Sequence, residues 1–291
     1  MAYPKPLKIS PDFSQEEYIK LTPEDAAWEQ LHFGARKLVI GQTWSGQTDD
    51  NEMVITILGG KASVKSNREN WPSIGRRPDV FSGMPYAVYL PRQTEFEITA
   101  LSDQLDLGYG WVATSEDHKM QLITPEMSSI EIRGGGNVTR QINSIVPPGF
   151  DCDKLVVVEV YTPSGNWSSY PPHKHDDHQV DADGNLIEAD LEEIYFYKID
   201  KPEGFAYQRI YTKDERIDEL LLVKDSELVI SPEGYHPVVS APGYTTYYLN
   251  FLAGTEQVLT ASDDPDYAWV KETFSQKDPR VPVVTMDMEK E

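Results

Sequence analysis

The stretch Tyr170-Pro-Pro-His-Lys-His-Asp-Asp177 places two histidines two residues apart, between prolines and acidic residues. Because successive side chains on a β-strand point to opposite faces, we expect His173 and His175 to project to one side and Lys174 to the other. Two neutral imidazoles on one face can clamp a divalent metal. The stretch therefore predicts a strand that carries half of a metal site.

Two later segments supply the ligands that this pair lacks. In the run Leu191-Glu-Glu-Ile-Tyr-Phe-Tyr197, alternation puts Glu193 on the same face as Tyr195. His236 follows a Ser231-Pro-Glu-Gly234 turn, in which proline pre-sets its own φ and glycine closes the turn. Such a turn can place a side chain at a fixed point on the rim of a sheet.

We therefore predict that His173, His175, Glu193 and His236 converge on one divalent cation. Glu192 would replace Glu193 if the strand register were shifted by one residue. A lone histidine is more often a surface or core residue than a ligand. This chain has only six histidines, however, and three of them lie in strand-like segments flanked by turn residues.

The whole chain shows a rhythm of short strand candidates separated by turn residues, which is typical of an all-β sandwich or barrel. The rhythm occurs twice, so we predict two jelly-roll-like β-barrels, residues 1–140 and residues 141–291. The first copy has no histidine in 67–80, where the second carries its histidine pair. We expect the first barrel to lack a metal. The strand candidates are 37–40, 53–58, 62–66, 87–90, 95–100 and 108–113, then 155–161, 194–199, 206–211, 219–223, 227–230 and 246–252.

Composition limits the partners of the protein. The 291 residues carry a formal charge of −22, which disfavours nucleic acid and anionic membrane surfaces. An anionic substrate would therefore need local attraction from the metal or from a buried Arg or Lys. Cys152 is the only cysteine, which excludes an intramolecular disulfide. Without a signal-like start or an apolar run of about 18 residues, we expect a cytoplasmic protein. Edge strands on two barrels lead us to expect self-association.

The chain contains several long motifs. They are Gly165-Asn-Trp-Ser-Ser-Tyr-Pro-Pro-His-Lys-His-Asp176, Glu193-Ile-Tyr-Phe-Tyr197, Gly204-Phe-Ala-Tyr-Gln-Arg-Ile-Tyr211, Pro232-Glu-Gly-Tyr-His-Pro-Val-Val-Ser-Ala-Pro-Gly-Tyr244 and, in the first half, Arg77-Pro-Asp-Val-Phe-Ser-Gly-Met-Pro-Tyr-Ala-Val-Tyr-Leu-Pro91. These motifs resemble the 5-deoxy-glucuronate isomerases of inositol breakdown, a family of the cupin superfamily. The resemblance implies a bicupin fold and conversion of 5-deoxy-glucuronate to 5-dehydro-2-deoxy-gluconate in myo-inositol degradation.

A metal with an open coordination position can polarise a carbonyl group and stabilise an enediolate, as an aldose–ketose isomerisation requires. Zinc, manganese, iron and nickel all suit three histidines and one glutamate. As catalytic groups we consider Glu159, a carboxylate inside a valine-rich strand, and Tyr211. As groups that bind a small sugar-acid substrate we consider Arg209, Gln208 and Tyr170. The simpler interpretation is an outward-facing glutamate at 159 and a structural ion pair at Arg209.

Two other functions need the same metal clamp. One is a metal-dependent cupin oxygenase that uses iron to activate O₂, and the other is a non-catalytic sugar-binding cupin. Oxygen uptake with substrate separates them, because an isomerase consumes no O₂ and a binding protein turns nothing over. The acidic segment 176–192 does not match a calcium-binding loop, since Gln179 stands where the first acidic ligand belongs. We expect a hairpin at the barrel mouth and a candidate lid.

Overall fold

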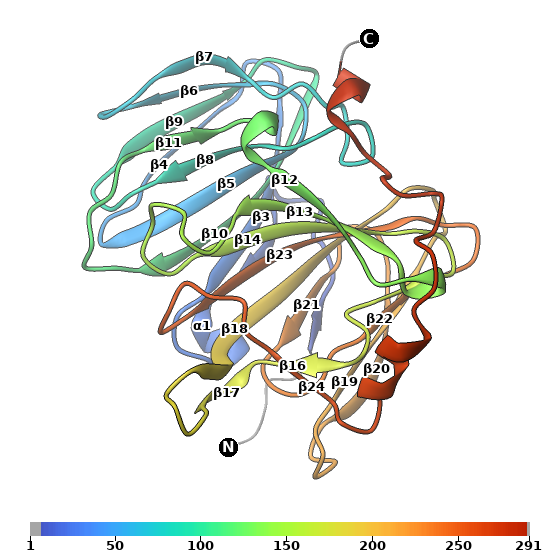
Figure 1. The fold of residues 1–291 in the computed structure, drawn as a ribbon. Coiled ribbons are helices and arrows are strands. Elements are labelled where there is room, and N and C mark those ends of the chain that lie inside the picture. The colour runs from blue at the N-terminus through green and yellow to red at the C-terminus, as the bar shows by residue number, and fades with distance from the viewer. Residues whose placement is uncertain (1–6, 290–291) are drawn as a thin grey trace.

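Four large β-sheets form successive layers in a computed structural model that describes residues 7–289 (Figure 1). The first half of the chain supplies a six-stranded and a four-stranded sheet, and the second half supplies an eight-stranded and a four-stranded sheet. The prediction of an all-β chain with two jelly-roll-like barrels is confirmed. No helix of the described residues is long and apolar enough to cross a membrane.

All strand pairs in the two sheets of the first half are antiparallel. Some pairs join strands that follow one another in the sequence, and others join strands that are far apart in it. The six-stranded sheet has the order β11 (Gln121–Ile123), β8 (Tyr86–Leu90), β5 (Asn51–Gly59), β10 (Gln104–Ala113), β3 (His32–Val39) and β2 (Glu17–Leu21). The four-stranded sheet has the order β4 (Thr43–Gln47), β9 (Glu95–Ala100), β6 (Ala62–Ser66) and β7 (Trp71–Ile74).

The sheets of the second half follow the same plan. The eight-stranded sheet has the order β1 (Lys8–Ile9), β21 (Leu228–Ser231), β18 (Leu186–Ile199), β23 (Thr246–Gly254), β14 (Val156–Thr162), β13 (Arg140–Val146) and β12 (Ser129–Arg133), with β17 (Asp176–Val180) on β18. The four-stranded sheet has the order β15 (Trp167–Ser168), β22 (Val238–Ser240), β19 (Ala206–Tyr211) and β20 (Asp218–Val223). A small sheet pairs β16 (His173–Lys174) with β24 (Ser262–Asp263).

Helices are short and lie outside the sheets. Thr22 caps α1 (Pro23–Ala26) by accepting a hydrogen bond from the backbone of Asp25, and Pro23 occupies the first turn, where its missing N–H is not needed. The 3₁₀ helices are η1 (Pro125–Met127), η2 (Gly136–Val138), η3 (Ala268–Thr273) and η4 (Met286–Glu289).

The predicted boundary at residue 140 does not coincide with the change of sheet. Strand β12 already pairs with β13 in the eight-stranded sheet of the second half, so the crossover lies between β11 and β12. At the other end, β1 pairs with β21 and so joins the second barrel, although it precedes the first one in sequence. The strands that flank the first barrel in sequence, β1 and β12, thus both belong to the eight-stranded sheet of the second barrel.

Three hydrophobic cores separate the four layers. One fills each barrel, and the third, around Phe33, Val54, Phe196 and Phe251, lies between the six-stranded and eight-stranded sheets. The two central sheets are therefore buried on both faces. Along β14, Val158 faces the interior of the second barrel, while its neighbours in sequence face the core between the barrels.

Two buried glutamates join the halves in equivalent ways. Glu52 on β5 accepts hydrogen bonds from three consecutive backbone N–H groups at 153–155, at 2.8 to 3.0 Å. Glu192 on β18 accepts hydrogen bonds from the backbone N–H groups at 29–31, at 2.6 to 3.1 Å. Each barrel thus satisfies the backbone donors of a loop from the other half, which relates β5 to β18 as corresponding strands.

Candidate metal centre

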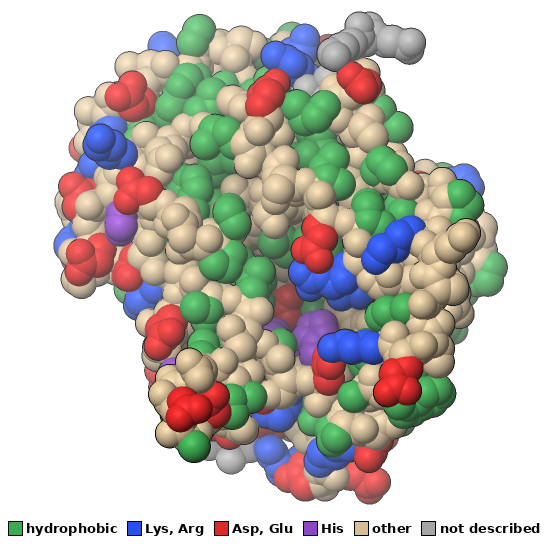
Figure 2. All heavy atoms as spheres, viewed as in Figure 1, with side chains coloured by type: hydrophobic (Ala, Val, Ile, Leu, Met, Phe, Trp, Pro, Cys, Tyr) green, Lys and Arg blue, Asp and Glu red, His purple; other side chains and the backbone are tan. Residues whose placement is uncertain are grey.

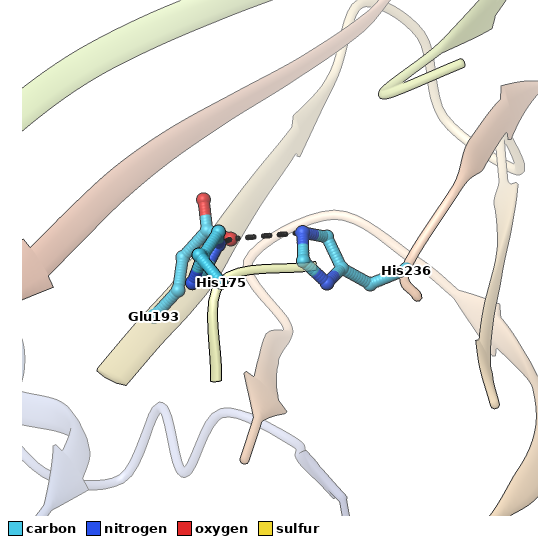
Figure 3. Close-up of side chains that lie close together, drawn as sticks. All are labelled: His175, Glu193 and His236. Atoms are coloured by element: carbon cyan, nitrogen blue, oxygen red, sulfur yellow. Dashed lines mark hydrogen bonds and ion pairs between the residues drawn. The ribbon is translucent and has the colours of Figure 1, made fainter. Parts of the chain in front are cut away.

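Three side chains from separate elements converge in the second barrel (Figure 3). His175 follows β16, Glu193 projects from β18, and His236 follows the turn after β21. The Oε2 atom of Glu193 lies 2.9 Å from Nε2 of His175 and 3.2 Å from Nε2 of His236. The possible ligand atoms all lie within 4.8 Å of one another, and within residues 7–289 no second group of this kind is found.

Backbone carbonyls orient both histidine rings. Nδ1 of His175 lies 3.1 Å from the carbonyl oxygen of Leu191, and Nδ1 of His236 lies 2.8 Å from that of Gly234. A carbonyl oxygen can only accept, so each Nδ1 carries hydrogen and each neutral ring presents a lone pair at Nε2. Both lone pairs point at a carboxylate oxygen. With both rings neutral, three electron-rich atoms meet at this point, and only a cation or a proton between them makes the contact favourable.

The protonation behaviour of the two histidine rings supports this. Burial lowers the pKa of His236 to about 3, against the opposing charge of Glu193, so its ring is neutral and its buried Nε2 has no hydrogen-bond partner. Burial also acts to lower the pKa of His175, but the hydrogen bond and charge of Glu193 outweigh it and raise the pKa. A proton on His175 thus takes the place of a cation. The donor set fits a divalent metal of the zinc, manganese, iron or nickel type.

His173 lies beside the trio and outside it. Its ring centroid is 5.0 Å from that of His236 and 6.4 Å from that of His175. Burial, followed by the charges of His175 and Arg140, lowers the pKa of His173 to about 3, so this ring is also neutral. Its role as a fourth ligand stays a prediction.

His173, His175 and Glu193 line a pocket of about 380 Å³ on the inner face of the eight-stranded sheet, and His236 lies behind them. Figure 2 shows the hollow, with histidine side chains in its depth and Lys and Arg side chains beside its opening. The lining includes Tyr170, Tyr195, Tyr248, Val158 and Val160, together with residues of the segment from Leu259 to Phe274. Its volume lies within the range of sites for small molecules.

Of the catalytic and substrate-binding residues expected from sequence, the structure brings Tyr170 to this pocket. Glu159 is buried on the opposite face of β14, where both carboxylate oxygens pair with Arg77 at 3.0 to 3.2 Å. Its carboxylate also accepts hydrogen bonds from Asn143, Tyr161 and Tyr247. The expectation that Glu159 is the catalytic base is therefore wrong in geometry, because the sheet separates it from the metal centre.

The three expected residues of β19 also lie outside the pocket lining. Gln208 accepts a hydrogen bond from Tyr197 at 2.8 Å and donates to the carbonyl of His236 at 3.4 Å, so it supports the metal centre from behind. Arg209 forms a two-point ion pair with Asp218, as the simpler interpretation held. Tyr211 donates to Asp264 at 2.6 Å. We expected all three residues in the pocket, and none of them lines it.

The register of β18 agrees with the prediction that Glu193 faces the site. Glu193 and Tyr195 line the pocket, whereas Glu192 points to the 29–31 loop. The 176–192 hairpin forms from β17 and β18. Its residues before Leu191 do not line the pocket, and the C-terminal segment provides the cover that the hairpin was expected to give.

Sequence reasoning missed Arg140 and Ser169, which line the pocket together with Tyr248. Tyr248 donates to Ser168 at 3.0 Å. Arg140 carried no motif of its own in the sequence. The available signal was the alternation of β13, whose even-numbered residues face the pocket, but this requires knowing which face is inside.

Residues 7–270 match the KduI/IolB family. The chain belongs to this family. The 5-deoxy-glucuronate isomerase of Geobacillus thermodenitrificans (strain NG80-2) is 43% identical over 256 residues, covering 88% of this chain and 91% of that protein. The protein of the same name from Bacillus subtilis (strain 168) is 37% identical over 256 residues, covering 87% and 92%.

Solved structures agree. The crystal structure of an IolB-like protein from Salmonella typhimurium LT2 gives a TM-score of 0.86 at 34% identity, over 90% of this chain and 98% of that one. Oxalate decarboxylase from Bacillus subtilis, a protein with Mn(II) centres, gives a TM-score of 0.58 at 11% identity, over 89% and 82%. The second likeness concerns the fold alone. The fold is that of a bicupin.

Proposed function

We propose that this protein isomerises 5-deoxy-glucuronate to 5-dehydro-2-deoxy-gluconate in myo-inositol degradation. The observation that carries the proposal is the buried trio of His175, Glu193 and His236, of which His175 and Glu193 line a pocket of sugar-acid size. The names of the family members support the substrate. A proton leaves the carbon beside the aldehyde and returns at the aldehyde carbon, while the hydroxyl proton of that neighbouring carbon moves to the former aldehyde oxygen, so the reaction balances without an oxidant or a reductant.

We propose His173, His175, Glu193 and His236 as the residues that hold one divalent cation. When bound, such an ion supplies a Lewis acid for a carbonyl oxygen and for the negative charge that develops after proton removal. Backbone carbonyls hold the rings of His175 and His236, and Gln208 contacts the carbonyl of His236 from behind. These contacts preserve the ring orientations that the centre requires.

The pocket walls then control water and protons. Val158, Val160 and Leu252 form an apolar side, which favours a dry enclosure in which charges interact strongly. Burial, then the charges of Glu193 and Tyr248, raise the pKa of Tyr195 well above its usual value. Its hydroxyl therefore keeps its proton near neutral pH and can donate a hydrogen bond to a substrate oxygen.

An anaerobic isomerisation assay on the metal-loaded protein tests the function. We expect conversion of 5-deoxy-glucuronate to its ketone isomer, loss of conversion after chelation, and recovery on adding zinc, manganese, iron or nickel salts. Conversion that survives complete metal removal, verified by elemental analysis of the same sample, would overturn the metal role. Oxygen uptake would identify an oxygenase, and binding without conversion would identify a sugar-binding protein.

Solvent deuterium tests the proton route. In D₂O we expect label at the carbon that receives the proton. A product that stays unlabelled over many turnovers contradicts proton exchange with solvent and favours a direct hydride shift or a fully shielded base.

A further inference from the structure

Arg140 is a buried cation without an anionic partner. It begins β13, the residue is 6% exposed, and it lines the pocket of the metal centre. Its Nη1 atom is buried and has no hydrogen-bond partner, and Arg140 forms no ion pair among residues 7–289. Buried guanidinium groups are ordinarily paired, because an unpaired charge loses its hydration without compensation.

The other cations of the pocket lining have partners. Arg133 pairs with Glu131 at 2.7 Å, and Lys271 pairs with Asp263. Arg133 and Arg140 are also direct cross-strand neighbours, so their like charges repel. Burial lowers the pKa of Arg140, and the charge of Arg133 acts in the same direction, against the opposing effects of Tyr248, Tyr195 and Glu131. The guanidinium nevertheless stays charged at neutral pH. The fold therefore keeps an electrostatically unfavourable cation in this pocket.

We propose that Arg140 binds the carboxylate of the sugar-acid substrate and so selects acids over neutral sugars. This inference rests on the proposed isomerase function. A planar guanidinium offers parallel N–H donors that match a carboxylate. With a net charge of −22, the molecule as a whole repels an anion, so a local unpaired cation is what the substrate requires.

The position of Arg140 suits the opposite end of the substrate from the metal. In the eight-stranded sheet, β13 is separated from β18 by β23 and β14. Three steps of strand spacing are roughly 14 Å along the sheet. Glu193 and Arg140 both extend from these strands into the same hollow. The charge of Arg140 acts on His173, so the guanidinium reaches back from β13 toward the metal centre and shortens this separation. The aldehyde of 5-deoxy-glucuronate and its carboxylate lie at opposite ends of the carbon chain, which matches a metal centre and a cation at two ends of one pocket.

Substrate selectivity provides the first test. We expect Arg140→Gln to lower kcat/KM for 5-deoxy-glucuronate on the order of 10- to 100-fold, as for loss of a charge-assisted hydrogen bond. With 5-deoxy-glucose, which has a hydroxymethyl group in place of the carboxylate, the loss should be less than about 3-fold. Arg140→Lys should retain part of the preference for the acid. Arg68→Gln makes the same charge change at a surface residue paired with Asp117, and should leave both values unchanged.

Ligand binding provides a second readout that needs no turnover. By calorimetry, we expect 2-deoxy-gluconate to bind the metal-loaded wild type at least about 10-fold more tightly than 2-deoxy-glucitol, and Arg140→Gln to remove this difference. Elemental analysis should show equal metal content in both proteins. The melting temperature of Arg140→Gln without ligand should be no lower than that of the wild type, because no native ion pair is broken.

The outcomes separate the two proposals. A wild type that does not isomerise the acid contradicts the proposed function, while the calorimetric comparison still tests Arg140. The role of Arg140 is overturned if Arg140→Gln still prefers 5-deoxy-glucuronate over 5-deoxy-glucose and 2-deoxy-gluconate over 2-deoxy-glucitol as the wild type does, whatever its activity. A lowered melting temperature with unchanged preference would show a structural arginine instead. Loss of acid preference in Arg209→Gln and not in Arg140→Gln would assign the carboxylate to Arg209.

Discussion

At the scale of single residues, the metal centre depends on ring orientation as much as on ligand identity. His236 is buried and neutral, with its Nδ1 hydrogen committed to the carbonyl of Gly234 and its Nε2 lone pair directed at Glu193. Loss of this ring removes one of the three convergent donors. The three proposed ligands that remain, His173, His175 and Glu193, would hold a divalent cation less tightly.

His236→Ala is therefore expected to lose bound metal and to abolish turnover. Elemental analysis after gel filtration measures the metal, and the anaerobic assay measures turnover. His118→Ala serves as the control, since His118 lies in the first half and pairs with Asp151. A variant at His236 that keeps a full equivalent of metal and wild-type rate contradicts the proposed ligand set.

Glu159→Gln tests the corrected role of Glu159. The carboxylate and Arg77 are both almost fully buried, and removing one partner of such a pair costs about 3–5 kcal/mol because the other charge stays uncompensated. We expect a lower melting temperature, with unchanged metal content and little change in rate per folded molecule. Arg77→Met combined with Glu159→Leu should recover part of the stability. A folded Glu159→Gln protein that has lost its rate selectively would restore Glu159 as the base.

At the scale of elements, the turn between β21 and β22 aims the His236 ring. Gly234 has a φ of +87°, and a Cβ at this position would lie 2.4 Å from the backbone oxygen of Tyr211. Its carbonyl accepts from His236, and its N–H donates to Asp176. The glycine therefore serves both the turn and the metal centre.

We expect Gly234→Ala to reduce metal affinity about 10- to 100-fold, the usual consequence of disturbing a contact that orients a ligand. Gly243→Ala is the matched control, because Gly243 also has a positive φ, +93°, but no atom lies within 4 Å of the added Cβ. Both variants carry backbone strain of about 1–3 kcal/mol. Metal titration at equal folded concentration separates strain from misplacement, and equal affinities in the two variants would show that the turn does not aim the ring.

At the scale of the whole molecule, the two barrels are unequal copies. Glu52 and Glu192 each accept hydrogen bonds from a run of three backbone N–H groups, so they occupy equivalent positions in the two barrels. The residues that follow them, Met53 and Glu193, are therefore equivalent as well. Strand pairing agrees, since Met53 lies opposite Leu90 as Glu193 lies opposite Ser231. A thioether thus stands in the first barrel where the second has its carboxylate ligand.

Metal analysis should consequently give no more than one ion per chain. The count should fall to zero in His236→Ala, because the same centre accounts for all of the bound metal. Two tightly held ions per wild-type chain, or one remaining in the variant, would show a site in the first barrel.

The sequence alone determined the strand rhythm and the duplication, and it pointed to four metal ligands, of which the structure brings His175, Glu193 and His236 together, with His173 beside them. These features rest on local geometry: alternation along a strand places Glu193, and the Ser-Pro-Glu-Gly turn presents His236. The long motifs added the family resemblance, which the match over residues 7–270 confirms.

Only the tertiary structure decided which face of each central strand is inside the second barrel. The central sheets are packed between two cores, so both faces are apolar and hydrophobicity cannot distinguish them. The sequence consequently could not show which way Glu159 and Arg140 face. Glu159 pairs with Arg77 between the barrels, whereas Arg140 lies unpaired in the pocket. Their roles depend on contacts between distant strands, which local sequence patterns do not encode.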